Sequence, residues 1–249
     1  MIDCRFFNFF IRIYEGYLGH SSLDFRVNRN ELIGMIVKRL TLATSALKDQ
    51  VDFYHQILGI SIFERKEDFI AFTIGHSKLE FFESRNTTPY HFAVNIPSNK
   101  APGALSWLRD RVEILKDGEH ELIEFKGWNA ESVYFYDADR NIVEFIARKN
   151  LGILVDKKFS EKHFLGISEI GMPVENIEKT YLHLKRLHDI EIFDGNFDNF
   201  CAIGDENGLF IVIDKQKKKW FPTGETAFSS PFRIEGDFNF KFQDGHILE

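Results

Sequence analysis

An internal repeat constrains this 249-residue chain more than any other feature. A short strand, an amphipathic helix and about three further strands follow one another, and then the same order begins again. In the first copy, the first and last strands are VKRLTLAT (37–44) and KLEFFE (78–83). In the second copy they are YHFAVNIP (90–97) and NIVEFIAR (141–148), and in the third copy LGISEIGMPV (165–174) and GLFIVID (208–214). Because self-similarity on this scale decides how a chain folds, the repeat predicts an α+β protein of tandem strand–helix–three-strand (βαβββ) modules.

The copies divide the chain into two predicted domains. Residues 35–150 hold two complete modules, and the polar stretch 149–162 separates them from a degenerate second domain at 163–249. A fourth copy is reduced to one or two strands at about 231–242, with no second helix. Residues 1–34 have no counterpart in the repeat, so we expect a poorly ordered or non-native leader and a natural start at Met35.

Composition and charge exclude several classes of function. The 31 basic and 38 acidic residues give a net charge of −7, which repels nucleic acid and anionic membrane surfaces. No apolar run approaches the roughly 18 residues that a membrane-spanning helix needs. Cys4 and Cys201 form no CxxC pair, which indicates a cytoplasmic protein without a cysteine zinc cage. The common nucleotide, hydrolase and zincin motifs are missing from the sequence.

Three polar residues stand within apolar strands and are the candidates for chemistry. His91 opens the second copy, Glu144 lies in its last strand, and Glu80 occupies the matching place in the first copy. Considered singly, His91 could be an ordinary hydrogen-bonded strand histidine, and each glutamate could be an ordinary strand residue that faces solvent. A carboxylate buried in such a strand needs a cation or proton partner, and the equivalent places of the two glutamates in the repeat favour a shared function.

Two segments carry a resemblance to a known family. RLTLATSALKDQVDFYHQILGISIFER (39–65) looks like the opening strand and helix of the vicinal oxygen chelate superfamily, which includes glyoxalase I, bleomycin resistance proteins and extradiol dioxygenases. YFYDADRNIVEFIAR (134–148) resembles its closing hairpin and glutamate strand, although Ala138 and Arg140 replace the usual proline and glycine. The resemblance implies two modules paired into a curved mixed sheet that cups a divalent metal, which is Fe, Mn, Ni or Zn.

Carried over by position, the resemblance implies Glu80, His91 and Glu144 as metal ligands. The fourth ligand place falls on Arg39, which is always cationic and cannot donate a lone pair to a metal. If Arg39 points aside, the protein is a metal-dependent lyase, isomerase or ring-cleaving dioxygenase on a small oxygen-rich molecule. Arg39 then orients the substrate, and Glu144 takes part in catalysis. If Arg39 points inward, its guanidinium pairs with Glu80 or Glu144, and the cup is a metal-free small-molecule binding site of the bleomycin resistance type.

The third copy is poorer in ligands. Glu169 stands where a first-strand histidine would be, and the closing strand has no carboxylate until Asp214. We therefore expect the second domain to act as a packing partner or as a mimic of a dimer mate. The expected partner is a small molecule, and the protein is either a monomer with an intrachain pseudo-dimer or a homodimer.

Overall fold

The computed structural model describes residues 34–249, so the expectation about a leader lies, except for Gly34, outside the described residues. All three predicted modules are present. The first comprises β1 (Val37–Thr44), α2 (Leu47–Val51) continued by a π-helical turn (Asp52–Ile57), β2 (Ile62–Arg65), β3 (Phe69–Ile74) and β4 (Ser77–Glu83). The second comprises β5 (His91–Ile96), α3 (Ala101–Arg109), β6 (Ile114–Leu115), β7 (Ile123–Phe125), β8 (Ala130–Tyr136) and β9 (Ile142–Arg148). The third comprises β10 (Gly166–Val174), α4 (Ile177–Leu187), β11 (Ile192–Gly195), β12 (Phe200–Asp205) and β13 (Gly208–Asp214).

The eroded fourth copy is longer than the sequence suggested. It forms three short strands: β14 (Phe232–Gly236), β15 (Phe240–Gln243) and β16 (His246–Leu248). As predicted, no helix follows β14 within the described residues. A single turn of 3-10 helix lies within the second module at Lys126–Trp128, and two more lie between the second and third modules at Lys149–Leu151 and Glu161–His163.

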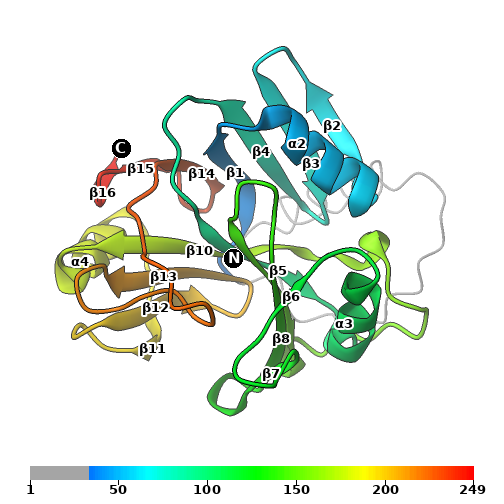
Figure 1. Ribbon diagram of the computed structural model, residues 1–249. Helices are drawn as coiled ribbons and strands as arrows, with labels where there is room; N and C mark the ends of the chain where they lie inside the picture. Colours follow the sequence, from blue (N-terminus) through cyan, green and yellow to red (C-terminus); the bar gives the residue numbers. More distant parts are fainter. Residues whose placement is uncertain (1–33) are drawn as a thin grey trace, which may run out of the picture.

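The strands form two curved mixed sheets, which confirms the predicted fold class (Figure 1). One sheet has the strand order β16-β15-β14-β1-β4-β3-β2, and the other β11-β12-β13-β10-β5-β9-β8-β6, with β7 also paired to β8. The first module thus pairs with the fourth copy through β1 and β14, and the second with the third through β5 and β10, both antiparallel. This pairing corrects the expectation that the first two modules share one cup. Each sheet draws strands from both sides of the expected boundary at 149–162.

The two sheets share one apolar core. Leu40 and Phe81 from the seven-stranded sheet are fully buried in the same cluster as Phe92 and Phe210 from the nine-stranded sheet. In Figure 1, α2 lies against the seven-stranded sheet, whereas α3 and α4 lie at the two halves of the nine-stranded sheet. Many of the chain's 27 phenylalanines fill this core, where a large apolar side chain contributes most to stability.

A tight hairpin fixes the start of β9. One carboxylate oxygen of Asp137 accepts hydrogen bonds from the backbone N–H groups of Asp139 (3.0 Å) and Asn141 (2.9 Å). The other accepts one from the Tyr54 hydroxyl, 2.9 Å away on the π-helical turn. Arg140 adopts a left-handed conformation, with φ of 61°, at the place where the family usually has glycine. The buried Asp137 therefore holds the turn that sets the register of β9.

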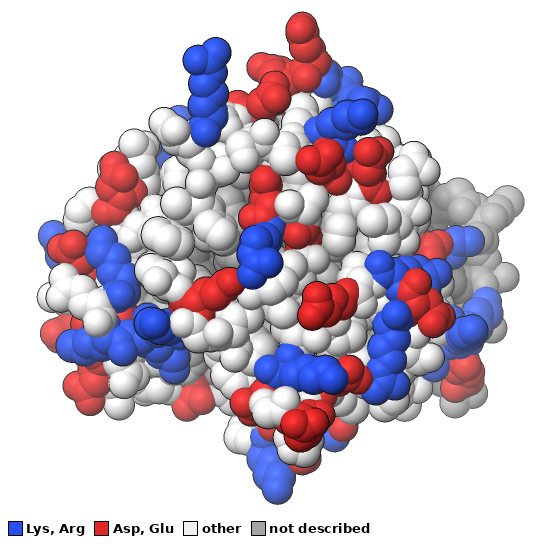
Figure 2. Space-filling model, in the orientation of Figure 1, with Lys and Arg blue, Asp and Glu red and all other residues white. Residues whose placement is uncertain are grey.

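Charges of both signs are dispersed over the surface. Figure 2 shows Lys and Arg side chains interspersed with Asp and Glu side chains over one face of the molecule. No helix within residues 34–249 is long and apolar enough to cross a bilayer.

Candidate metal centre

Three strands of the nine-stranded sheet bring His91, Glu144 and Glu169 together. Ala93 in β5 lies opposite Glu144 in β9 and opposite Glu169 in β10. Side chains alternate along a strand, so His91 shares the face of Ala93. Because the Ala93 side chain is a single methyl group, the three larger side chains can converge above it.

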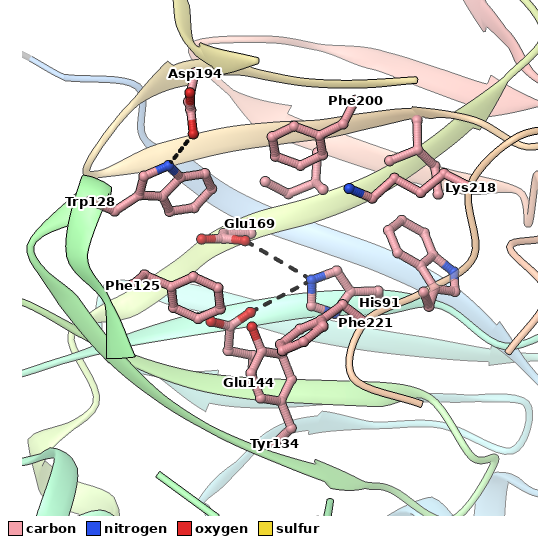
Figure 3. A pocket seen from close by; sticks show the side chains of 13 residues that line it. His91, Phe125, Trp128, Tyr134, Glu144, Glu169, Asp194, Phe200, Lys218 and Phe221 are labelled. Atoms are coloured by element: carbon pink, nitrogen blue, oxygen red, sulfur yellow. Dashed lines mark hydrogen bonds and ion pairs between the residues drawn. The ribbon is translucent and has the colours of Figure 1, made fainter. Parts of the chain in front are cut away.

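The converging groups form a compact cluster. One ligand atom from each of the three residues lies within 4.8 Å of the others. Nε2 of His91 is 3.6 Å from a carboxylate oxygen of Glu144 and 4.0 Å from one of Glu169, as Figure 3 shows. All three residues are at least nine-tenths buried. Such a cluster inside a folded chain is costly unless a proton or cation lies between the groups.

The His91 ring is held with one nitrogen free. Its Nδ1 lies 3.2 Å from the backbone carbonyl oxygen of Ile142, an acceptor, so Nδ1 carries the proton and Nε2 offers a lone pair. Burial lowers the pKa of His91 to about 4, which keeps the imidazole neutral at pH 7. The ring of Trp220 lies beside it, with the ring centres 5.1 Å apart. His91 is therefore oriented and protonated as a metal ligand requires.

The two carboxylates differ in their partners. Glu169 accepts a short hydrogen bond from Nη2 of the fully buried Arg148, which lies at the end of β9. Burial, and then the charge of Glu144, raise the pKa of Glu169 to about 8, although Arg148 opposes the shift. Burial also raises the pKa of Glu144, and the hydroxyls of Ser132 and Tyr134 oppose that shift.

The donor set fits a divalent transition metal. In the deprotonated state that binds a metal, the lone pair of His91 and the two carboxylate oxygens that face it are all acceptors, so a cation between them relieves their mutual repulsion. A metal at about 2.1 Å from each atom spans separations of up to about 4.2 Å, and the two distances from His91 lie within that limit. One imidazole and two carboxylates suit Fe, Mn, Ni or Zn, and leave positions open for a ligand.

Two of the predicted site residues lie elsewhere. Glu80 is in β4 of the seven-stranded sheet, where it accepts hydrogen bonds from Arg39, at short distance, and from the Thr41 hydroxyl at 2.9 Å. The Arg39 side chain is 39% exposed and also lies 3.7 Å from Glu235. The structure thus brings together His91 and Glu144 but not Glu80. Arg39 pairs with Glu80, one of the two partners that the sequence left open, but it does so in the sheet that does not hold the cluster.

Glu169 and Arg148 are the site residues that the sequence reasoning did not select. The repeat places Glu169 at a first-strand position, but the sequence predicts that its domain is a packing partner or a mimic of a dimer mate. The signal was a carboxylate in the middle of the apolar run GISEIGMPV, all of which is buried. Arg148 ends the strand IVEFIAR, which is apolar except for Glu144 and Arg148, and a buried guanidinium there requires an acid nearby.

A cavity of about 330 Å³ opens over the cluster. Its aromatic lining comes from β7 and the 3-10 turn after it, from β8 and β12, and from the loop that follows β13, as Figure 3 shows in part. The lining side chains are His91, Phe125, Trp128, Tyr134, Glu144, Glu169, Asp194, Phe200, Ile211, Ile213, Lys218, Trp220 and Phe221. A volume in this range is typical of small-molecule sites.

Paired βαβββ modules around a histidine and two glutamates define a protein of the vicinal oxygen chelate class. The sequence profile of the Glyoxalase/Bleomycin resistance protein/Dioxygenase superfamily matches residues 36–198, more than half of the chain, and the chain belongs to this superfamily. No protein of curated function matches the chain in sequence.

One of the solved structures that the chain resembles has a TM-score above 0.5 and shows the same fold. A "putative dioxygenase" from Bacillus subtilis is 16% identical and has a TM-score of 0.53, with the match covering 72% of this chain and 64% of that protein. A glyoxalase I mutant from Zea mays is 14% identical, with a TM-score of 0.47 and coverage of 71% and 65%. Lactoylglutathione lyase from Agrobacterium tumefaciens is 16% identical, with a TM-score of 0.39 and coverage of 44% and 91%. The chain spans slightly less than two thirds of the first two proteins.

Proposed function

We propose that this protein is a divalent-metal-dependent enzyme that acts on a small oxygen-rich molecule, with His91, Glu144 and Glu169 as the metal ligands. The observation that carries the proposal is the convergence of three buried acceptor groups at the floor of a cavity. Membership in the superfamily supports the same conclusion. The proposed ligand set keeps His91 and Glu144 from the sequence prediction and replaces Glu80 by Glu169.

A bound divalent metal would supply Lewis-acid catalysis for a substrate whose adjacent oxygens reach the open positions. The protein's own residues orient the ligands and shape the cavity. Arg148 holds Glu169 in place through its hydrogen bond, and the Ile142 carbonyl holds His91. We expect a lyase, isomerase or ring-cleaving dioxygenase reaction, with Glu144 beside the reacting atoms.

Tyr134 is a further donor within the cavity. Burial, and then the charges of Glu144 and Glu169, raise its pKa well above 10, so its hydroxyl keeps the proton at neutral pH. Tyr134 lines the cavity, and its hydroxyl donates its one proton toward the carboxylate of Glu144 and so helps to orient this proposed ligand. The aromatic lining around it excludes water and strengthens such a bond.

One observation favours a second candidate function, a metal-free protein that binds a small molecule. The Arg148 guanidinium already gives Glu169 a cationic partner, so part of the negative charge in the cluster is compensated without a metal. In this alternative a proton shared among His91 and the two carboxylates replaces the metal, and the cavity sequesters its ligand without changing it.

Metal analysis of the untagged protein distinguishes the two candidates. After incubation with Fe, Mn, Ni or Zn and removal of excess metal, we expect one ion per chain in the wild type and a loss of most of it in His91→Ala. His55→Ala is the matched control, because Nδ1 of His55 also lies near a backbone carbonyl oxygen, 2.9 Å away on Ile60, and no carboxylate faces its ring within the described residues. Wild-type protein that retains none of the four metals would contradict the enzyme proposal.

Two broader expectations accompany the proposal. The nine-stranded sheet is completed by two modules of one chain, which supports a monomer with an intrachain pseudo-dimer. The cysteine content supports a cytoplasmic location.

A further inference from the structure

The loop between β13 and β14, residues 215–231, forms one wall of the cavity. It contributes Lys218, Trp220 and Phe221 to the lining. The loop also connects the two sheets, because β13 belongs to the nine-stranded sheet and β14 to the seven-stranded sheet. The ligands of the proposed metal come from three sheet strands, whereas this loop faces whatever part of the bound molecule extends away from them.

Lys218 is the side-chain cation in the cavity lining. It is half-buried, and its Nζ lies 4.4 Å from the centre of the Phe200 ring. No carboxylate pairs with it among residues 34–249. Its neighbours differ in this respect, because Lys215 lies 3.3 Å from Glu175 and Lys217 lies 2.9 Å from Asp214. The charge of Lys218 is therefore available to a ligand.

The charges around the cavity favour an anionic ligand. Its lining holds three carboxylates, from Glu144, Glu169 and Asp194. Asp194 already accepts a hydrogen bond of 2.6 Å from the Trp128 indole. Against these stand Lys218, the buried Arg148 behind Glu169 and the two charges of the proposed metal. With the metal bound and all three acids ionised, one positive charge remains in excess, and a site of low dielectric makes such an imbalance effective over the width of a small molecule. Without the metal the three acids outnumber the two side-chain cations, so only the local charge of Lys218, which has no carboxylate partner among residues 34–249, favours an anion.

The shape of the cavity points to a planar ligand. The rings of Phe125, Trp128, Phe200, Tyr134 and Phe221 surround the space above the cluster, and Figure 3 shows Lys218 extending into it opposite Tyr134. Aromatic walls favour stacked or edge-on contacts with a flat ring. A planar molecule with oxygens at the cluster and an acidic group within reach of Lys218 matches these two parts of the lining.

We propose that Lys218 is a specificity-determining residue that binds the carboxylate, or an equivalent anionic group, of a planar aromatic substrate. The inference rests on the proposed function for the metal end of the substrate, and on Lys218 alone for the acidic end. Lys218 selects among substrates by an ion pair within an aromatic enclosure, where exclusion of water makes a charge-assisted hydrogen bond stronger.

Binding of a matched pair of probes tests the proposal. Metal-loaded protein is titrated by tryptophan fluorescence or calorimetry with 3,4-dihydroxybenzoate and with catechol, which differ only in the carboxylate. We expect the wild type to bind the carboxylated probe about tenfold more tightly, as a single partly buried charge-assisted bond allows. Lys218→Met should reduce this ratio to about one and leave catechol binding unchanged, whereas Lys218→Arg should retain the preference. Lys217→Met is the control, because Lys217 is paired outside the cavity, and it should keep the wild-type ratio.

A second pair of probes separates this inference from the metal proposal. Benzoate and benzamide have no adjacent hydroxyls, so they are titrated into chelator-treated protein. A benzoate preference that Lys218→Met abolishes would support the role of Lys218, even if the protein proves to bind no metal. Equal affinity for the members of each pair in the wild type, a preference that survives Lys218→Met, or no binding of any probe would overturn the inference.

Discussion

The buried guanidinium of Arg148 donates a hydrogen bond to one carboxylate oxygen of Glu169, while the other carboxylate oxygen lies 4.0 Å from Nε2 of His91. Glu169 is thus shared between a permanent cation and the cluster that we assign to a metal. Arg148 is fully buried, and its Nε and Nη1 have no hydrogen-bond partner among the described protein atoms. The stability of the site therefore depends on this pair.

Replacing Arg148 alone should be strongly destabilising. At about pH 9, above the pKa of about 8 for Glu169, Arg148→Met leaves the ionised Glu169 buried without its cation, and we expect a loss of about 3–5 kcal/mol in the free energy of unfolding of the metal-free protein. Urea denaturation followed by circular dichroism measures the loss. The double variant Arg148→Met/Glu169→Gln should recover most of it, because no unpaired charge remains. A double variant no more stable than the single one would show that Arg148 acts through packing against Trp128 and Phe193 instead.

The stability of the metal-free protein should fall as the pH rises from about 5 to 8. Burial raises the pKa of Glu169 to about 8 in the folded chain, whereas an unfolded glutamate titrates near 4.3. Between these values the folded state holds one more proton, so each pH unit lowers the free energy of unfolding by up to about 1.4 kcal/mol. This contribution is fully present below pH 4 and is lost as the pH passes through 8.

Thermal or urea unfolding of chelator-treated protein across this pH range tests the prediction. Other groups also titrate, so the informative quantity is the difference between wild type and Glu169→Gln, which lacks the proton-binding group. We expect a shallower decline in the variant. Parallel pH profiles for the two proteins would show that Glu169 is not the group responsible.

Gly171 sets the position of Trp220 beside His91. A Cβ added at Gly171 would lie 2.5 and 2.7 Å from two carbons of the Trp220 ring, so Gly171→Ala must displace the indole from the cavity wall. We expect a cost of about 1–3 kcal/mol in stability, as for other overpacked sites, together with a shift in tryptophan emission and weaker binding of 3,4-dihydroxybenzoate. Gly127→Ala is the control, because a Cβ there meets no atom within 4 Å. Unchanged emission and affinity in Gly171→Ala would contradict this placement of Trp220.

Arg39 should matter for stability and not for the cavity. Arg39→Met removes a partly exposed pair with Glu80, which keeps its bond from Thr41. We expect a loss of about 1–2 kcal/mol, with metal content and probe affinity unchanged. Arg85→Met, at an exposed arginine in the same half of the chain, is the control for stability. A large loss of metal or of probe affinity in Arg39→Met would instead support the substrate-orienting role that the sequence suggested for Arg39.

Local sequence patterns predicted the modules, but they did not predict which modules pair with each other. The helix spacing and the alternation within strands indicated βαβββ units, and His91 and Glu144 stood out as polar residues in apolar strands. Which first strands become neighbours is a long-range property, because β1 and β5 are both apolar and either could pair with several partners. The decisive strand was β14, which belongs to a copy too eroded to recognise as a module and which nevertheless occupies the open edge of β1.

The choice of the third ligand followed from that pairing. Glu80 and Glu144 are equivalent in the repeat, and the resemblance to the superfamily implied that both are ligands of one site. Once β14 occupies the edge of β1, β5 pairs with β10 instead, and Glu169 enters the cluster from the other side of Ala93. Glu80 stays paired with Arg39. Charge complementarity could have indicated that Glu80 and Glu169 belong to different sheets. Arg39 pairs with Glu80 within the seven-stranded sheet, and Arg148 pairs with Glu169 within the nine-stranded sheet.

Metal content of Glu169→Gln and Glu80→Gln is the most direct test of the central claim. Both variants replace a buried strand glutamate that accepts a hydrogen bond from an arginine, so they perturb folding in comparable ways. Each is loaded with Mn or Fe, freed of excess metal and analysed by mass spectrometry beside the wild type. We predict that Glu80→Gln retains one metal per chain and that Glu169→Gln loses most of it. Loss in Glu80→Gln with retention in Glu169→Gln would contradict the assignment of the metal centre to the nine-stranded sheet.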